Sequence, residues 1–358
     1  MSTVPVLDGH NDLLFRLWSD DADPVAAVAG GREGHLDLPR MEAGGFRAGL
    51  FAVYVPDARR LDPPSGTGGG YSIPLSDPLD PGRARRITDE QLALLHRLVE
   101  GCEGLRLVRT AADLDACLAG EAVGAVAHVE GAGGIAPDLS NLDALVGAGV
   151  RSVGPVWSRP NHFAHGVPFE FPASPDVGPG LTDAGRALVR ACEERGVLVD
   201  CAHLNAAGFW DVADCTEAPL VVSHAGVHAL CPASRNLTDE QLDAVAESGG
   251  LVGITFGVGA LDPEGRFGHD VPLDTLADHV LYVAERVGVE HVALGSDFDG
   301  ASVPSEVGDV SGLPRLLDHL RERGLSERDV ERVAAGNWRR VLDEVWREGE
   351  GGRTRRVE

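Results

Sequence analysis

The sequence contains no lysine. All 31 basic residues are arginine, and 56 acidic residues outnumber them, which gives a net charge of −25. A surface with this much negative charge repels phosphate groups, so nucleic acid and anionic membranes are poor partners for the molecule as a whole. Either salt tolerance or a coding bias towards arginine, alanine, glycine and aspartate would explain the acidity, and we favour the coding bias.

Long apolar runs are missing, and the N-terminus has no basic segment followed by an apolar one. We therefore expect neither a membrane-spanning helix nor a secretion signal, and we expect a cytoplasmic protein. The six cysteines form no C-x-x-C pair and mostly fall within apolar patterns, which favours reduced core thiols over disulfides or a zinc knot. No G-x-G-x-x-G follows the first predicted strand and no P-loop pattern occurs, so no nucleotide site is indicated.

What the sequence does contain is an alternation of short apolar runs with amphipathic segments. Runs typical of buried strands start at residue 4 and recur at 48–55, 122–129, 150–157, 197–202, 219–223, 251–256 and 291–296. Strands that alternate with helices imply parallel βαβ units, and about eight of them predict an α/β fold, a closed TIM-like (β/α)8 barrel with extra C-terminal helices. An open doubly wound sheet is the second choice. We expect one barrel domain over residues 1–348 and a disordered tail at 349–358.

Capping residues predict where several helices begin. The sequence T-D-E-Q occurs at 88–91 and at 238–241, and each copy matches a capping box. The first copy would begin a helix that ends at Gly101. Two segments without any period, 20–34 and 56–86, are rich in Asp, Gly or Pro and are expected to be loops. The longer one is either a functional lid or disordered.

Ionisable side chains stand at the ends of the predicted strands. His10 and Asp12 are two residues apart, so in a strand both side chains point the same way. In a barrel of this kind the carboxyl ends of all strands meet at one face, where sites are built. The predicted metal ligands are His10, Asp12, Glu130, His203, His224 and Asp297.

Three histidines and three carboxylates are enough for two divalent metal ions with one bridging carboxylate. This donor set suits zinc, with manganese, cobalt and iron as alternatives. A single histidine at a strand end is more often an ordinary polar residue than a ligand, but six candidate ligands at the ends of five predicted strands are hard to explain by accident. His128 lies deeper in its strand and is expected to be a packed barrel residue. His162, His165 and His228 lie in loops, where they either contact substrate or are solvated.

Six short motifs resemble the membrane (renal) dipeptidase family of zinc peptidases, which belongs to the metal-dependent amidohydrolase superfamily. The resemblance extends from Leu7 to about Leu342, with the motifs in the family's order. They are D-G-H-N-D at 8–12, H-V-E-G at 128–131, D-C-A-H at 200–203, V-S-H at 222–224, S-R-N at 234–236 and G-S-D-F-D-G at 295–300.

The resemblance implies a binuclear zinc dipeptidase that cleaves the peptide bond of dipeptides with a free C-terminal carboxylate, by attack of a metal-bound hydroxide. His10, Asp12 and Asp297 would hold one zinc, His203 and His224 would hold the other, and Glu130 would bridge the two ions. Asp297 would also move the proton from the hydroxide to the leaving amine. Arg235 would bind the substrate carboxylate, since a planar guanidinium matches it, and Asn161 also matches the family. The resemblance allows a homodimer.

Two positions depart from the family pattern. Trp157, or Ser158 in a shifted alignment, stands where the family usually has a substrate-contacting histidine, and Gly257 stands where the mammalian enzymes have a tyrosine. These changes keep open an alternative substrate, such as an N-acyl amino acid, a cyclic amide or a lactone. A non-catalytic metal-binding scaffold is a further alternative. We expect Trp157 to line the site and narrow the pocket. If it turned outward instead, Asn161 or His162 would take over its contact.

Overall fold

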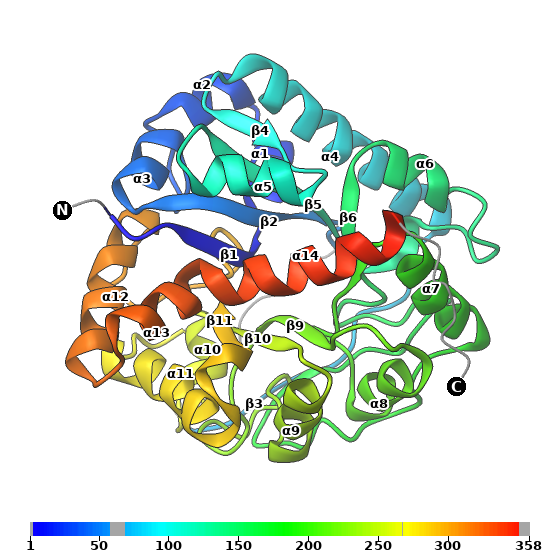
Figure 1. Ribbon diagram of the computed structural model, residues 1–358. Helices are drawn as coiled ribbons and strands as arrows, with labels where there is room; N and C mark the ends of the chain where they lie inside the picture. Colours follow the sequence, from blue (N-terminus) through cyan, green and yellow to red (C-terminus); the bar gives the residue numbers. More distant parts are fainter. Residues whose placement is uncertain (1–2, 58–68, 267, 351–358) are drawn as a thin grey trace, which may run out of the picture.

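The computed structural model of the protein describes residues 3–57, 69–266 and 268–350. Eight parallel strands form a ring at the centre of the molecule, and helices surround it (Figure 1). Most residues of these strands are buried, because helices cover the outside of the ring while side chains fill its interior. The ring strands are β1 (Val6–Asn11), β2 (Phe46–Tyr54), β5 (Val123–Glu130), β6 (Val150–Gly154), β8 (Leu198–Val199), β9 (Val221–Ala225), β10 (Leu251–Ile254) and β11 (Val292–Leu294).

Two ladders make up the ring, one in the order β1-β2-β5-β6-β8 and the other in the order β9-β10-β11. Single parallel bridges join them at both seams, between Asn11 and Phe298 and between Asp200 and Val221. The predicted α/β barrel is therefore confirmed. A further short strand, β4 (Leu105–Leu107), pairs with the start of β5 and lies outside the ring. An antiparallel pair, β3 (Tyr71–Ile73) with β7 (Phe169–Phe171), also lies outside it and was not predicted.

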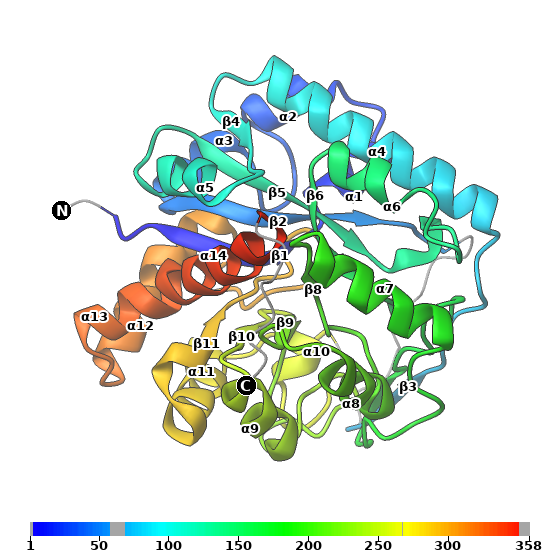
Figure 2. The same cartoon turned by 45° about the vertical axis from the view of Figure 1, so that its right-hand side comes forward.

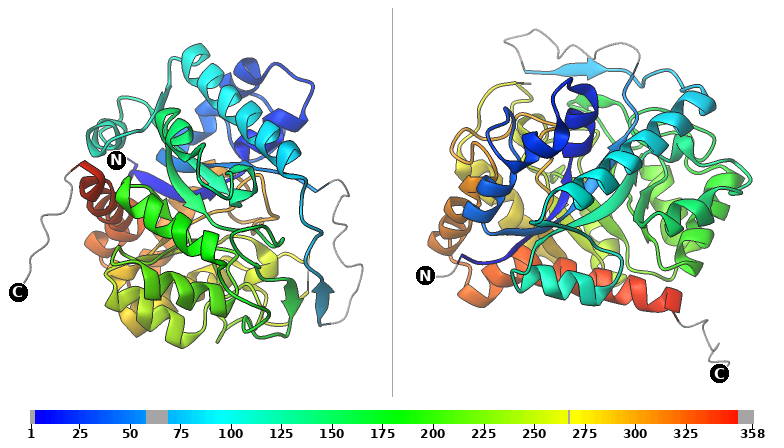
Figure 3. Two further views of the ribbon diagram at one scale, coloured as in Figure 1. Left: turned by 90° about the vertical axis from the view of Figure 1, so that its right-hand side faces the viewer. Right: turned by 90° about the horizontal axis from the view of Figure 1, so that it is seen from above.

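The last helix, α14 (Asn337–Glu350), closes the end of the barrel where the strands begin. Its apolar side chains pack against residues from the first halves of several strands, such as Leu7, Leu50 and Val126. The indole nitrogen of Trp338 donates a hydrogen bond to the carbonyl oxygen of Leu294. A Cβ at Gly9 would lie 2.4 Å from the Trp338 ring, so this glycine lets the helix approach. Figure 3 shows α14 at one end of the barrel and β3 at the other. The strands therefore present their carboxyl ends on the side away from α14.

The remaining helices form the outer layer (Figure 2). In the part of the chain that the structure describes, none of them is long and apolar enough to cross a membrane. They are α1 (Leu13–Ser19), α2 (Pro24–Ala29), α3 (Leu38–Ala43), α4 (Pro81–Gly101), α5 (Ala111–Leu118), α6 (Leu142–Gly147), α7 (Asp183–Glu194), α8 (Ala206–Cys215), α9 (Asp239–Glu247), α10 (Val258–Leu261), α11 (Leu273–Val287), α12 (Leu313–Glu322) and α13 (Glu327–Glu331), with a π-helical segment at Arg332–Gly336.

Only one of the two T-D-E-Q sequences begins a helix. Thr238 forms the predicted capping box, because its hydroxyl accepts from the Gln241 amide while the Gln241 side chain accepts from the Thr238 amide. The prediction at Thr88 is wrong. The helix α4 already starts at Pro81, where the Asp80 side chain accepts from the Arg83 amide, and Thr88 is buried in its interior. The Pro- and Gly-rich residues before Thr88 are typical of a loop, so the sequence pattern gave no indication that the helix begins at Pro81.

Other segments predicted as loops contain regular structure. The segment 20–34 includes α2, and 56–86 includes β3 and the first turn of α4. The alternatives of lid or disorder for 56–86 fall partly on residues 58–68, which lie outside the described residues. The predicted tail begins two residues too early, since α14 extends to Glu350, and residues 351–358 lie outside the described part. All six cysteines are free, and all but Cys215 are buried.

Candidate metal centre

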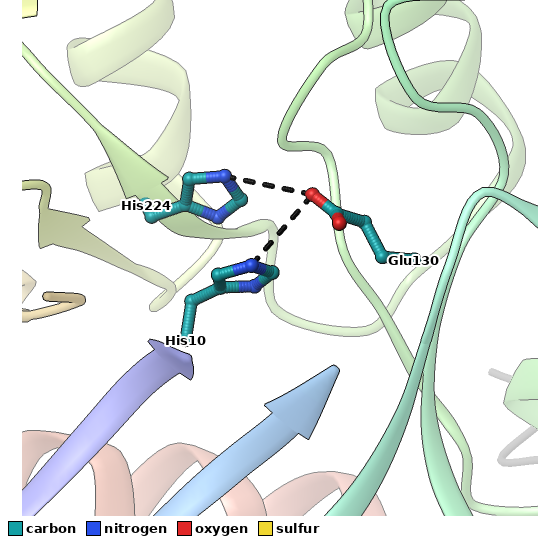
Figure 4. A group of neighbouring side chains, drawn as sticks. All are labelled: His10, Glu130 and His224. Atoms are coloured by element: carbon teal, nitrogen blue, oxygen red, sulfur yellow. Dashed lines mark ion pairs between the residues drawn. The ribbon is translucent and has the colours of Figure 1, made fainter. Parts of the chain in front are cut away.

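The six predicted ligands lie together at the carboxyl ends of the barrel strands. His10, Glu130 and His224 belong to the strands β1, β5 and β9, and their side chains converge (Figure 4). Asp12, His203 and Asp297 follow β1, β8 and β11 by one to four residues. Residues separated by up to 287 positions in the chain thus meet because a barrel brings all of its strand ends to one face.

The carboxylate of Glu130 occupies the middle of the group. Its Oε1 atom lies 3.0 Å from Nε2 of His203 and 3.7 Å from Nε2 of both His10 and His224. A second set of ligand atoms, from His10, Asp12 and Asp297, also lies within 4.8 Å of one another. The geometry therefore gives two adjacent groups of donors that share His10, and Glu130 lies next to all three histidines.

Two of the ligands have an unusual backbone conformation. His203 and Asp297 have φ angles of 63° and 61°, in the left-handed region that residues with a Cβ seldom adopt. Backbone hydrogen bonds hold both turns: the Asp297 amide donates to the His10 carbonyl, and the Val167 amide donates to the His203 carbonyl. Such conformations collect at functional sites, where the surrounding structure holds the strained residue in place.

Hydroxyl groups orient two of the imidazoles. Nδ1 of His203 lies 2.9 Å from Oγ of Ser158, and Nδ1 of His224 lies 2.8 Å from Oγ of Ser223. The Ser223 hydroxyl itself donates to Oδ2 of Asp200 at 2.6 Å, so its oxygen is left to accept from His224. A proton on Nδ1 leaves the lone pair of Nε2 facing Glu130, which is the tautomer that a metal ion requires.

The electrostatics of the group favour a cation. Burial raises the pKa of the Glu130 and Asp297 carboxyls, and the nearby Asp12 carboxylate raises both further. Burial lowers the pKa of His203 and His224 well below the usual value, which keeps these imidazoles neutral. Buried carboxylates that repel one another are stabilised by a divalent ion, and oxygen with neutral imidazole nitrogen is a suitable donor set for one. The residues present therefore fit a metal centre.

Arg235 lies half-buried beside this centre. One of its terminal nitrogens donates to the carbonyl oxygen of His224 at 3.2 Å. Burial lowers the pKa of its guanidinium, which the charges of Asp297 and Glu130 partly offset. Within the described residues no carboxylate forms an ion pair with Arg235. A half-buried guanidinium with free donors is able to bind an anion.

Trp157 lies at the edge of the centre. Its ring centroid is 5.5 Å from that of His203, 5.1 Å from that of Tyr54 and 5.7 Å from that of Phe169, and the guanidinium carbon of Arg159 lies 5.4 Å from it. The ring is half-buried and contacts a predicted ligand, as expected for a residue that lines the site.

The other predicted positions are used differently. The Asn161 side chain donates to the Pro155 carbonyl and accepts from the amides of Phe163 and Ala164, so it shapes its own loop. The space next to Gly257 is bounded by Asp297, whose Oδ2 would lie 3.5 Å from a Cβ there.

Three further histidines, His128, His162 and His228, form hydrogen bonds within the barrel or its loops. His128 is fully buried and contacts the Ser152 hydroxyl, as predicted for a packed residue. His162 and His228 hydrogen-bond to backbone carbonyls at Ile135 and Ala173.

Sequence reasoning missed Tyr54 and the residues that orient the ligands. Tyr54 ends β2 directly opposite Glu130 in the ladder, and burial, together with the charge of Glu130, raises the pKa of its hydroxyl. It stands at a predicted strand end, so the rule that identified the ligands would have identified it had aromatic residues been considered. No sequence signal indicated Ser158 as a partner of His203, since 45 residues separate them.

Comparisons with known proteins give a consistent picture. The model of a family described as membrane dipeptidase (peptidase family M19) matches residues 1–353. The chain is 45% identical over 278 residues to an uncharacterised protein in the pqqA 5′ region of Klebsiella pneumoniae, covering 77% of this chain and all of that one. It is 32% identical to the dipeptidase aclJ of Aspergillus oryzae, over 96% of this chain and 79% of that protein.

A similar solved structure is the metallopeptidase of Rhodobacter sphaeroides, crystallised with a phosphinate mimic of the dipeptide L-Ala-D-Ala. It is 39% identical, superposes with a TM-score of 0.91, and the match covers 96% of this chain and 100% of that one. The similarity therefore extends over nearly the whole barrel and includes the face where the six ligands converge.

Proposed function

The chain belongs to the membrane dipeptidase family of metal-dependent hydrolases, and we propose that it cleaves dipeptides that have a free C-terminal carboxylate. The observation that carries this proposal is the position of Arg235. Its half-buried guanidinium lies next to the ligand group and has no carboxylate partner among the described residues. A substrate carboxylate would complete this pairing and place the adjacent peptide bond over the ligands.

We propose two divalent metal ions and, on the basis of the donor set, we propose zinc; the same ligands also suit manganese, cobalt or iron. His10, Asp12 and Asp297 would hold one ion, His203 and His224 the other, and Glu130 would lie between them. The ions, when bound, supply positive charge that polarises the scissile carbonyl and acidifies the attacking water.

The protein's own side chains have three roles in the proposed reaction. Glu130 and the imidazoles hold the centre, with Ser158 and Ser223 fixing the orientation of two rings. Arg235 binds and orients the carboxylate. Asp297 would accept the proton of the attacking water and pass it to the departing amine, since its carboxylate lies among the ligand atoms beside which that water would bind.

The relative solved with a dipeptide mimic supports a small-molecule substrate. One continuous hydrophobic cluster contains residues from Val6 to Ala334, which supports the expected single domain over residues 1–348. A second candidate substrate is an N-acyl amino acid. The presence of Trp157 favours it, because an indole next to His203 offers an apolar surface to an acyl group.

The test is an assay of metal-loaded protein against dipeptides, their C-terminal amides and N-acyl amino acids. We expect dipeptides to be cleaved and the amides to be cleaved far more slowly. Cleavage of N-acyl amino acids without any cleavage of dipeptides would replace the first proposal by the second. Protein that is loaded with metal and inactive on every compound would indicate a metal-binding scaffold.

A further inference from the structure

A cavity of about 220 Å³ lies beside the metal centre, on the far side of Trp157. It is smaller than the ~300–1,000 Å³ typical of pockets for drug-sized ligands, so it suits one side chain rather than a whole ligand. The loops after β2, β5 and β6 and the start of α4 form its walls. The apolar part of its lining includes Val55, Leu79, Ala84, Gly131, Gly133 and Trp157.

The polar side chains in this wall already have hydrogen-bond or ion-pair partners within the protein. Arg159 forms an ion pair with Asp57 and donates to the Val55 carbonyl at 2.6 Å. The Asn161 side chain forms hydrogen bonds with the backbone of its own loop, and His162 is hydrogen-bonded to the Ile135 carbonyl. The cavity therefore offers a guest mainly carbon atoms, and an apolar side chain gains free energy by leaving water there.

Two residues connect the cavity to the metal centre. Gly131 lines the cavity and directly follows Glu130, and Trp157 lines it while its ring contacts His203. A Cβ at Gly131 would lie 3.2 Å from the Trp157 amide nitrogen and 3.3 Å from the Trp157 Cβ. The absence of a side chain at Gly131 therefore lets Trp157 pack close to the end of β5. A substrate over the ligands would thus reach the cavity along the Trp157 ring.

The cavity lies across the barrel from Arg235. Arg235 follows β9, and the cavity is built on β2, β5 and β6. In the eight-strand ring, β9 is four places from β2, three from β5 and two from β6, so the two features face each other across the ligands. A dipeptide whose carboxylate binds Arg235 has its N-terminal residue on the opposite side of the scissile bond, towards the cavity.

We propose that this cavity binds the side chain of the substrate's N-terminal residue and selects apolar side chains of the size of leucine or phenylalanine. The proposal deepens the dipeptidase function given above and depends on it. Gly133 provides the test, because it lines the cavity, has a negative φ, and a Cβ there would have Ala84 Cβ as its nearest neighbour at 3.8 Å. Gly133→Leu therefore fills the cavity without a clash at Cβ.

The experiment compares wild type, Gly133→Leu and the control Gly147→Leu on Leu-Ala, Phe-Ala and Gly-Ala, each made with L- and D-alanine. Gly147 lies at the exposed end of α6, and a Cβ there meets nothing within 4 Å. We expect wild type to prefer Leu-Ala and Phe-Ala over Gly-Ala. In Gly133→Leu the ratio of kcat/KM for Leu-Ala to that for Gly-Ala should fall roughly tenfold or more, the usual effect of altering an apolar pocket by a few carbon atoms. The control should keep the wild-type ratio.

Inhibition gives a second readout that does not depend on turnover. Phosphinate mimics of Leu-Ala and Gly-Ala should differ in Ki for wild type and for the control, and this difference should shrink in Gly133→Leu. Equal losses for all substrates and both inhibitors in Gly133→Leu would overturn the cavity proposal, and so would a wild-type preference for Gly-Ala. Metal-loaded wild type that cleaves no dipeptide at all would instead overturn the dipeptidase function.

Discussion

The Ser158 hydroxyl lies 2.9 Å from Nδ1 of His203, on the side of the imidazole away from Glu130. The hydrogen bond places the two ring nitrogens in different roles, with Nδ1 facing the hydroxyl and Nε2 facing the carboxylate at 3.0 Å. Ser158 follows Trp157 in the loop after β6, so one short stretch of chain both supports a ligand and lines the pocket.

Replacing Ser158 by alanine should weaken metal binding. Without its partner the His203 ring is freer to rotate and change tautomer, and loss of such partners typically costs about 10–100-fold in metal affinity or activity. Titration of the apoprotein with zinc in the presence of a competing chelator would measure this. Ser140→Ala, in an exposed loop, is the control. An unchanged affinity in Ser158→Ala would show that His203 is oriented by packing alone.

Removal of the metal should lower thermal stability as well as abolish activity. We expect two metal ions per chain by elemental analysis. His10 lies near the end of the first ring strand, Asp12 follows that strand and Asp297 follows the last one, so an ion bound there would connect the two strands at one seam of the barrel. An ion present at 100 times its Kd stabilises the folded state by about 2.7 kcal/mol. An unchanged melting curve after proven metal removal would show that the site is not coupled to folding.

Replacing Arg235 by methionine should lower kcat/KM on dipeptides by roughly 30-fold or more, since removing one partner of a charge pair costs about 2–5 kcal/mol. The metal content should stay the same, because Arg235 is not among the proposed ligands. Wild type should distinguish a dipeptide from its C-terminal amide, and the variant should not. Arg190→Met, on the exposed side of α7, is the matched control. Equal activity of wild type on both compounds would contradict the assigned role.

Replacing Trp157 by histidine should change which substrates are preferred without changing the metal count. Histidine is smaller than tryptophan and titrates near neutral pH, so the pocket beside His203 would become wider and more polar. The ranking of dipeptides and N-acyl amino acids by kcat/KM measures the effect. If the ranking and the rates both stayed as in wild type, Trp157 would not belong to the substrate pocket.

Stability should fall in mild acid partly because of His279, which lies in α11 away from the metal centre. Its Nδ1 accepts a hydrogen bond from the Val227 amide, and burial lowers its pKa to about 4. Since the unfolded chain binds this proton near the usual pKa of about 6.5, the stabilisation is full above that pH and is lost as the pH falls towards 4.

Between pH 7.5 and pH 5 this histidine alone should account for about 2 kcal/mol of the free energy of unfolding. Urea unfolding at both pH values measures the change. The variant His279→Gln keeps a hydrogen-bond acceptor for the Val227 amide but cannot titrate, so it should show a shallower dependence on pH than wild type. Identical dependence in the two proteins would exclude His279 as a source.

Much of the site could be predicted from local sequence, because each ligand directly follows or ends an apolar run. The period of two in a strand placed His10 and Asp12 on one side, and the rule that barrel strands end at one face grouped them with Glu130 and Asp297. An aromatic residue at a strand end does not by itself indicate a site, since aromatic residues are equally common in cores, and Tyr54 was overlooked for that reason.

The helix starts also show that local sequence patterns predict some features and miss others. The capping box at Thr238 depends on four consecutive residues and was predicted correctly. The identical residues at Thr88 lie inside α4, where Gln91 instead hydrogen-bonds the backbone of Tyr54 at the end of β2. A contact with a residue 37 positions away decided this case, and local sequence does not contain it.

The sequence by itself determined the alternation of strands and helices, the barrel and the residues able to bind metal, because these follow from patterns within a few neighbouring residues. Only the tertiary structure decided that Glu130 lies between the histidines, that Ser158 orients His203, and that a cavity opens behind Trp157. Each of these is a distance between segments far apart in the chain. Such distances depend on how the strands close and the loops pack, which no short stretch of sequence specifies.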